Sequence, residues 1–315
     1  MRILVLGAGG VGGYFGGRLL EAGAEVSFLV REGRARQLAA RGLVIKSPVG
    51  DAALKVRTLT AADPGEPFDL ILLTCKAYDL AAAMESIAPH MAAGRGLVLP
   101  LLNGMAHVEA LRARFGADRA IGGLCGIFAT LSPEGDMLHL DKFARLAFGR
   151  FQDQIRRGVL AREVDEIARL MATGNFTSQR SEPIEQGLWD KWVMLATMAG
   201  ATCLMRGSVG AILDATDGTA IMEELLAEIG SVAAAAGFPP SEAGLATARS
   251  VLFARGSAAS ASMLRDIRKG GRIEGDHIIG DMLRRARGFG LKTPLLRVAN
   301  AHVQTYEIER AKAAG

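Results

Sequence analysis

The chain has 315 residues, a length that favours two packed domains over a single one. Half of the residues are hydrophobic and 22% are charged, a composition that excludes an intrinsically disordered chain. The formal net charge is only +4, and the basic residues are scattered among acidic ones without forming a basic stripe that contains aromatic residues. We therefore expect no nucleic-acid partner.

The sequence gives no sign of export, of a membrane anchor or of a metal site. Met1 leads directly into a strand-like run without the features of a signal peptide, so we expect a cytoplasmic protein. Apolar stretches such as residues 97–102 are too short to cross a bilayer, and we expect no membrane partner. Cys75, Cys125 and Cys203 lie far apart, and no histidine pairs with another ligand at metal-binding spacing, so we expect no metal ion.

The first predicted elements are a strand over residues 2–6 and a helix over residues 11–21, joined by a glycine-rich turn. Glycines in a G-x-G-x-x-G turn allow a tight bend, close approach of the backbone to a pyrophosphate, and close packing of the helix on the strand. The helix end adds backbone amides for the phosphates. A purely structural turn is the alternative, but the position between strand and helix predicts a dinucleotide site formed by Gly7, Ala8, Gly9, Gly10, Val11 and Gly12.

The second predicted strand, residues 25–30, ends next to a residue that bears on cofactor choice. NAD-binding domains usually carry an acidic residue there for the ribose 2′-hydroxyl, whereas this chain has Arg31. A guanidinium suits a 2′-phosphate, and Arg34 or Arg36 is close enough in sequence to assist. The sequence therefore favours NADP(H), with a solvated loop residue as the alternative interpretation of Arg31.

The rest of the first half alternates predicted strands with helical segments such as residues 80–90, which indicates a mostly parallel sheet covered by helices. Residues 43–56 and 137–148 are predicted to add antiparallel strands. The further strands of the parallel sheet are predicted at residues 70–74, 96–101 and 120–125.

A polar stretch at residues 175–180 is the predicted linker, and Ser181 is expected to cap the first helix of the second half. The fold class is therefore α/β, with an N-terminal Rossmann-type dinucleotide-binding domain over residues 1–178 and an all-α C-terminal domain over residues 179–315. Apolar helical faces that contain Met222, Leu225 and Leu226 are expected either to pack internally or to form a homodimer. The predicted helices of the second half cover residues 183–205, 218–236, 241–254, 260–269, 276–289 and 294–312.

Five short signatures complete the pattern, and their order and spacing carry more information than any one of them. They are Lys76 in Thr74–Tyr78, Asn103 in Leu102–Met105, Lys191 in Leu188–Trp192, Ser262 in Ser262–Asp266, and Glu274 in Ile273–Asp276. Together with the glycine turn and Arg31, they resemble the ketopantoate reductase (2-dehydropantoate 2-reductase) family over nearly the whole chain. The resemblance implies hydride transfer from NADPH to a 2-oxo acid, with ketopantoate, reduced to pantoate for pantothenate biosynthesis, as the first candidate substrate.

By this resemblance Lys191 is the proton donor and also contacts the substrate. The chemistry agrees, because a carbonyl that receives hydride becomes an alkoxide, which needs a proton and a nearby positive charge. A surface lysine whose stem covers an apolar patch is the alternative.

The resemblance also assigns roles to the other signatures. Lys76 contacts the cofactor, Asn103 contacts both the nicotinamide ribose and the substrate, Ser262 contacts the substrate carboxylate, and Glu274 contacts the cofactor or Lys191. The alternatives are loop-stabilising polar residues at Lys76 and Asn103, a helix cap at Ser262, and a surface carboxylate at Glu274.

The sequence departs from the family where the substrate is expected. The family's usual pattern has asparagines four and eight residues after the catalytic lysine, but this chain has Leu195 and Ala199. Arg206 is a hypothetical replacement anchor for the substrate carboxylate. Because Leu195 and Ala199 cannot hydrogen-bond a substrate, a more apolar 2-oxo acid is an alternative to ketopantoate, and a non-catalytic NADP-binding sensor is a third interpretation.

Overall fold

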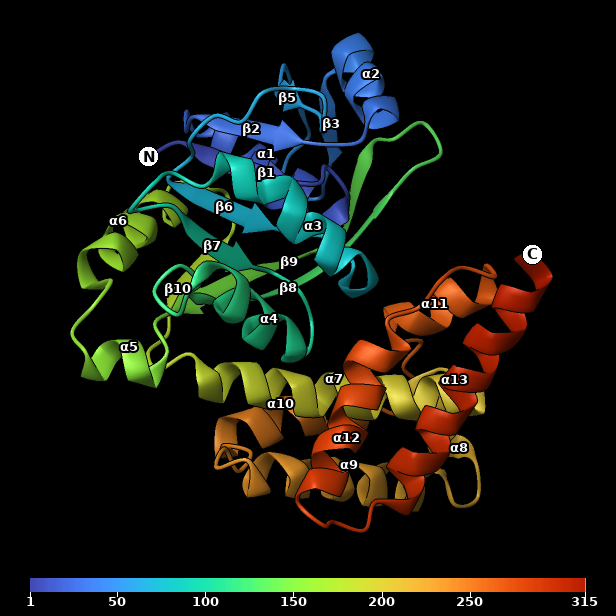
Figure 1. Cartoon of the computed structure of the whole chain (residues 1–315). Helices are drawn as coiled ribbons and strands as arrows, with labels where there is room; N and C mark the ends of the chain where they lie inside the picture. Colours follow the sequence, from blue (N-terminus) through green and yellow to red (C-terminus); the bar gives the residue numbers. More distant parts are fainter. Residues whose placement is uncertain (315) are drawn as a thin grey trace. The chain divides into compact units, whose positions relative to one another are not determined.

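The structure, a computed structural model, describes residues 1–314 and divides them into two compact units (Figure 1). The N-terminal unit consists of Met1–Leu102 and His107–Ile184. The C-terminal unit contains everything from Glu185 onward together with the short segment Asn103–Ala106. The α/β class and the all-helical second half predicted from the sequence are both confirmed.

A five-stranded parallel sheet forms the centre of the N-terminal unit, in the order β5-β2-β1-β6-β7. Strands β2, β6 and β7 are buried at every position, as expected of apolar runs covered on both faces. The strands are β1 (Ile3–Leu6), β2 (Val26–Leu29), β5 (Arg57–Leu59), β6 (Leu70–Leu73) and β7 (Leu97–Pro100).

Alternate residues of each strand point to opposite faces of the sheet, so apolar strands have two apolar faces. Helices cover both of them. Ile3 shares one core with Phe15 of α1, whereas Leu4 shares the other core with Leu80 of α3 and Leu111 of α4. The helical elements of the unit are α1 (Gly10–Glu21), α2 (Glu32–Arg41), η1 (Ala77–Asp79), α3 (Leu80–Ile87), η2 (Ala88–His90), α4 (Ala106–Phe115), α5 (Gln152–Arg156) and α6 (Ala161–Met171).

A second sheet packs into the same unit, in the order β10-β9-β3-β4, with β8 paired to β9. Its strands β3 and β4 are antiparallel as predicted, but β9 is antiparallel only to β8 and runs parallel to β3 and β10. The strands are β3 (Leu43–Lys46), β4 (Ala52–Leu54), β8 (Gly122–Leu131), β9 (Met137–Gly149) and β10 (Thr177–Arg180).

Two sequence-based expectations are corrected here. Residues 120–125 were expected to extend the parallel sheet, but only Ala120 bridges to it, and the strand from Gly122 pairs with β9 instead. The expected linker and the boundary between residues 178 and 179 fall on β10, and the division comes after Ile184. A largely exposed strand at the sheet edge has polar residues, so its composition resembles that of a linker. Ser181 donates its backbone N–H to Phe148 next to β10, and the next helix begins later, at Glu185.

The C-terminal unit is built around α7, which contacts α8, α9, α10, α11 and α13 (Figure 1). Met222, Leu225 and Leu226 are buried and therefore pack inside this unit. No helix among residues 1–314 is both long and apolar enough to cross a membrane. The helices of this unit are α7 (Glu185–Met205), α8 (Val209–Asp214), α9 (Gly218–Ala235), α10 (Glu242–Leu252), α11 (Ser262–Arg268), the π-helical turn η3 (Asp276–Gly280), α12 (Asp281–Gly288) and α13 (Pro294–Ala314).

Candidate active site

The glycine turn of the N-terminal unit connects β1 to α1 and presents the start of the helix. Gly7 has a φ of +96°, a backbone conformation that favours glycine. The Gly13 N–H donates to the Gly9 carbonyl at 2.8 Å, which is the first hydrogen bond of the helix. The N–H groups that precede Gly13 therefore lie at the helix end, where an anion can accept their hydrogen bonds.

The glycines of this turn meet two different requirements. A Cβ at Gly12 would overlap the Gly7 carbonyl oxygen and the Thr74 hydroxyl, so packing within the protein requires glycine at this position. A Cβ at Gly9 would meet no protein atom within 4 Å, so no contact inside the protein accounts for that glycine. Open space beside Gly9 fits a dinucleotide whose phosphates approach the backbone closely.

A cavity of about 800 Å³ lies at the carboxyl ends of β1, β2 and β6. Ligands in open α/β sheets bind at this end of the strands. The cavity is lined by residues from the glycine turn, from the segment after β2 and from the segment after β6, among them Gly9, Arg31, Lys76 and Asp79. The structure thus brings most of the predicted cofactor-binding residues of this unit to one hollow.

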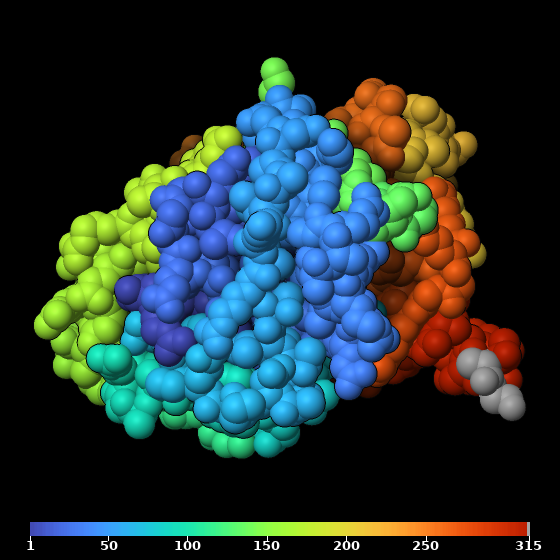
Figure 2. Space-filling model, turned by 90° about the horizontal axis from the view of Figure 1, so that it is seen from above, coloured from blue at the N-terminus to red at the C-terminus, as the bar shows by residue number. Residues whose placement is uncertain are grey.

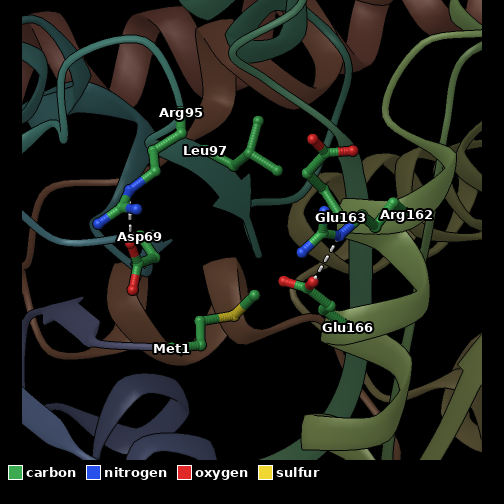
Figure 3. Close-up of a pocket in the computed structure, with 7 residues that line it drawn as sticks. All are labelled: Met1, Asp69, Arg95, Leu97, Arg162, Glu163 and Glu166. Atoms are coloured by element: carbon green, nitrogen blue, oxygen red, sulfur yellow. Dashed lines mark hydrogen bonds and ion pairs between the residues drawn. The ribbon is translucent and has the colours of Figure 1, made fainter.

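A second hollow, of about 350 Å³, lies at the opposite, amino ends of the strands (Figure 3). Its charged side chains are largely paired with one another: Arg95 with Asp69 at 3.2 Å and Arg162 with Glu166 at 3.1 Å. Its position and its internally paired charges make it a weaker candidate for a ligand site than the cavity beside the glycine turn.

Arg31 lies at the mouth of the larger cavity, and its side chain is 88% exposed. Its Nη2 donates to Oδ2 of Asp79 at 3.0 Å. Arg36, expected as a possible helper, forms a 3.6 Å ion pair with Glu32 instead. Both guanidinium groups are exposed and each contacts a carboxylate, but of the two only Arg31 lines the cavity.

Arg34, the other residue expected to assist Arg31, connects two turns of the N-terminal unit by hydrogen bonds. Its guanidinium donates to the carbonyl of Ala8 at 2.9 Å and to the carbonyl of Gly135 at 2.8 Å, which ties the glycine turn to the turn between β8 and β9. In Figure 2 the green atoms of this hairpin lie against the blue atoms of the α2 segment. Burial lowers the pKa of Arg34. These hydrogen bonds hold the guanidinium in place, while Arg34 also lines the cavity, so its assistance to Arg31 stays a prediction.

The C-terminal unit holds the predicted proton donor on α7. Lys191 Nζ donates to Oδ1 of Asn103 at 2.9 Å, which joins two residues predicted separately from the sequence. The neighbours of Lys191 fix the orientation of the helix. Trp192 is buried and donates its indole N–H to the Ile278 carbonyl at 3.0 Å, while Asp190 accepts hydrogen bonds from the N–H and hydroxyl of Ser241.

His277, which the sequence did not single out, lies against the same Asn103 segment. A Cβ at Gly104 would come within 2.9 Å of the His277 ring, and Gly104 has a φ of +82°. The ring is hydrogen-bonded to the backbone of Asn103, and burial lowers the pKa of His277 although the charge of Glu274 acts to raise it. Glu274 therefore lies near enough to act on His277, just before the π-helical turn, a feature frequent at functional sites.

Ser262 lies apart from the other predicted residues of this unit, near the C-terminal part of α7. It is the exposed first residue of α11, and the N–H of its neighbour Ala261 donates to Oγ1 of Thr202 at 3.3 Å. Thr202 follows Lys191 by eleven residues, or about 16 Å along the helix axis. Within this unit the structure thus groups Lys191, Asn103 and the Glu274 segment, and it places Ser262 near the far end of the same helix.

Two family models match the chain. The model described as ketopantoate reductase PanE/ApbA matches residues 3–153, and the model of the ketopantoate reductase PanE/ApbA C terminal matches residues 183–307. The chain belongs to the ketopantoate reductase family. It is therefore an oxidoreductase of that family, as its sequence signatures predicted.

Individual relatives support this membership. The chain is 34% identical to an uncharacterized oxidoreductase, YkpB, of Bacillus subtilis, over 98% of this chain and 100% of the relative. It is 26% identical to 2-dehydropantoate 2-reductase of Halobacterium salinarum, over 94% of this chain and 96% of the relative. Both alignments extend through the two units.

Solved structures share the fold. A ketopantoate reductase of the PanE/ApbA family from Ralstonia eutropha superposes with a TM-score of 0.86 at 24% identity, covering 99% of this chain and 100% of the other. D-mandelate dehydrogenase with NADH and anilino(oxo)acetate superposes with a TM-score of 0.87 at 20% identity, with the same coverage. At these identities the likeness establishes the fold alone.

The departures from the pattern of the ketopantoate reductase family lie on α7. Leu195 is half-buried and Ala199 is buried, so an apolar stretch follows Lys191 along the helix. Arg206, proposed from the sequence as a carboxylate anchor, is exposed with a φ of +56°, and its carbonyl accepts a hydrogen bond from Arg268. Its role as a carboxylate anchor stays a hypothesis.

Proposed function

We propose that this member of the ketopantoate reductase family reduces a 2-oxo acid to a 2-hydroxy acid with NADPH. The observation that carries the proposal is the 2.9 Å hydrogen bond from Lys191 Nζ to Asn103 Oδ1. An ammonium held in a fixed direction by a neutral amide suits the protonation of a carbonyl oxygen. A non-catalytic sensor would have no need for this arrangement.

The residues of the glycine turn would hold NADPH, which would supply a hydride for the carbonyl carbon of the oxo acid. Lys191 donates a proton from Nζ to the carbonyl oxygen, which completes the hydroxyl group, and it regains a proton from solvent. A lysine has three N–H donors, so the bond to Asn103 sets the direction of Nζ while another donor serves the substrate. Positive charge at Nζ also stabilises the oxygen as negative charge develops there.

The residues of the glycine turn fit the proposed cofactor. Gly9 leaves room for a pyrophosphate, the start of α1 offers amides to it, and Lys76 lines the same cavity. Arg31 supports the preference for NADPH because an exposed guanidinium can form a bidentate pair with a 2′-phosphate.

Ketopantoate is the first candidate substrate, in keeping with the curated relatives named 2-dehydropantoate 2-reductase. The half-buried side chain of Leu195, one helical turn after Lys191, favours a second candidate, a 2-oxo acid with a larger apolar side chain. The structural neighbour named D-mandelate dehydrogenase fits this alternative, since mandelate is an aryl 2-hydroxy acid. Reduction of ketopantoate would place the protein in pantothenate biosynthesis.

The test is oxidation of NADPH, followed by its absorbance, with ketopantoate, pyruvate and phenylglyoxylate as substrates. Wild type is compared with Lys191→Met, which keeps an apolar stem but loses the ammonium, and with Lys269→Met, which alters an exposed lysine of the same unit. We expect turnover that Lys191→Met lowers by about 10²-fold or more and that Lys269→Met leaves unchanged. Turnover of phenylglyoxylate alone would replace the substrate, whereas tight NADPH binding without any turnover would favour the sensor.

We also propose a homodimer, because a solved ketopantoate reductase from Staphylococcus aureus is described as dimeric. Sedimentation equilibrium of the purified protein tests this assembly, and a monomer at micromolar concentration would refute it.

A further inference from the structure

The cavity beside the glycine turn contains a carboxylate that binds the cofactor-selecting arginine. Asp79 ends the η1 turn that follows Lys76, and its Oδ2 lies 3.0 Å from Nη2 of Arg31. The Asp79 side chain is 37% exposed, and both residues line the cavity. An exposed ion pair contributes little to stability, so Arg31 can leave Asp79 at small cost when a ligand arrives.

A 2′-phosphate at Arg31 would enter the field of this carboxylate. Because Arg31 and Asp79 are in contact, a phosphate that pairs with the guanidinium comes within a few ångströms of Asp79. The phosphate carries between one and two negative charges near neutral pH, so it competes with Asp79 for Arg31 and is repelled by it. Asp79 therefore opposes the ligand that Arg31 attracts.

A 2′-hydroxyl at the same place meets a favourable partner. A carboxylate accepts hydrogen bonds from ribose hydroxyls, and NAD-binding domains use an acidic residue in this way. That acidic residue usually follows the second strand, where this chain has Arg31. Asp79 approaches the site from a different element, the turn after β6, and offers an equivalent carboxylate.

The other charged groups of the cavity do not duplicate Asp79. Glu32 also lines the cavity, but its carboxylate is paired with Arg36 at 3.6 Å. Arg34 donates to backbone carbonyls, and Lys76 adds positive charge to the lining of the cavity. Of the carboxylates that line this cavity, Asp79 is the one with a described contact to Arg31.

We infer that Asp79 limits the preference of this site for a 2′-phosphate, so that NADH binds with an affinity closer to that of NADPH than Arg31 alone would give. This inference rests on the proposed function for the identity of the ligand, and it adds a specificity-determining residue to the proposed site. It predicts that an enzyme lacking the Asp79 charge discriminates more strongly against NADH.

The experiment compares two nucleotides that differ in the 2′-phosphate, independently of any reaction. Adenosine 2′,5′-bisphosphate and adenosine 5′-monophosphate are titrated into the full-length protein by calorimetry at fixed ionic strength. The variants are Asp79→Asn, the matched control Glu32→Gln, and Arg31→Ala. Thermal unfolding of each variant shows whether the fold is retained, and NADPH and NADH are titrated in parallel by their fluorescence.

The measured quantity is the affinity for the 2′-phosphate nucleotide divided by the affinity for the 2′-hydroxyl nucleotide. We expect Asp79→Asn to raise this ratio by about ten-fold or more, because the substitution removes the repulsion between two close negative charges near the protein surface. Glu32→Gln should change the ratio by less than about three-fold, because its charge is paired elsewhere. Arg31→Ala should lower the ratio. A ratio that stays within about two-fold in Asp79→Asn, an equal change in Glu32→Gln, or no binding of either nucleotide would overturn the inference.

The outcomes separate this inference from the proposed function. If Asp79→Asn shifts the nucleotide ratio as expected but no 2-oxo acid is reduced, the proposed reaction fails and the role of Asp79 stands. If oxo acids are reduced in a Lys191-dependent manner but the ratio does not move, the inference alone fails.

Discussion

Alanine at Gly9 should weaken cofactor binding and leave the fold stable, whereas alanine at Gly12 should destabilise the fold. A Cβ at Gly9 meets no protein atom within 4 Å, and the φ of −87° at Gly9 suits alanine. Gly9 is the N-cap residue of α1, so we expect the change to cost less than about 1 kcal/mol of stability. The methyl group would stand where the pyrophosphate approaches, so affinity for NADPH should fall by about ten-fold or more, or about 1.4 kcal/mol.

Gly12→Ala should act on the fold instead. Its Cβ would overlap the Gly7 carbonyl oxygen and the Thr74 hydroxyl, and these two residues directly follow strands β1 and β6 of the parallel sheet. Overpacking of this kind costs about 1–3 kcal/mol, which outweighs the roughly 1 kcal/mol that alanine gains over glycine inside a helix. The nearest contact of this Cβ, 2.2 Å to a backbone oxygen, places the cost in the upper part of that range, at about 2–3 kcal/mol. The net loss is then about 1–2 kcal/mol, and the melting temperature should fall by several degrees.

The two variants are measured by NADPH fluorescence titration and by thermal unfolding. Gly33→Ala serves as the control, because its Cβ also meets nothing within 4 Å and Gly33 lies in the exposed helix α2. It should retain affinity and should not lose stability, because alanine is favoured over glycine in a helix by up to about 1 kcal/mol. Wild-type affinity in Gly9→Ala, or wild-type stability in Gly12→Ala, would refute the division of tasks between the two glycines.

Three further predictions concern single side chains. Asn103→Ala removes the acceptor of the Lys191 bond, so kcat/KM for the oxo acid should fall by about 10–100-fold while the melting temperature stays within a few degrees; unchanged kinetics would refute the pairing. Burial acts to raise the pKa of Glu182, but hydrogen bonds from Arg150 and Arg180 lower it to about 2. The carboxylate therefore stabilises the fold above its unfolded pKa of about 4.5 and loses this effect as the pH falls toward 2. Glu182→Gln should cost about 2 kcal/mol in urea unfolding at pH 7 and progressively less in acid, and a cost independent of pH would contradict this account. Burial lowers the pKa of His277, so protonation favours the unfolded chain and stability should drop as the pH falls below about 6.5. His277→Gln should flatten that part of the unfolding curve, and an unaltered pH dependence would refute the role of the imidazole.

Local patterns gave the most reliable predictions. The strand, the glycine turn and α1 follow one another within the first residues, and each is determined by neighbours in sequence. Lys76 lies three residues after the apolar run that forms β6, as the predicted order of strand and polar residue implies. These features depend on hydrophobic periodicity and turn chemistry, which a single sequence displays.

The features that the sequence did not reveal depend on contacts between distant residues. Arg34 on α2 donates to Gly135 in the turn between β8 and β9, and Asp79 in the η1 turn contacts Arg31. The partners lie far apart in sequence, so no sequence spacing could predict either pairing. Strand β10 was taken for a linker because its polar residues reflect an exposed sheet edge. The sequence did not predict that His277 contacts the Asn103 segment, because a single histidine in a helical segment does not indicate which residues surround it.

The segment Asn103–Ala106 has a consequence for how this enzyme can be divided. The chain passes between the two units after Leu102, after Ala106 and after Ile184, so the C-terminal unit is assembled from two separate pieces of sequence. A fragment that starts at Glu185 would carry Lys191 but not Asn103, the acceptor of its hydrogen bond. The proposed proton-donating centre therefore cannot be cut out, exchanged or inherited as one continuous gene segment, and any successful transplant would have to carry the loop after β7 along with the helices.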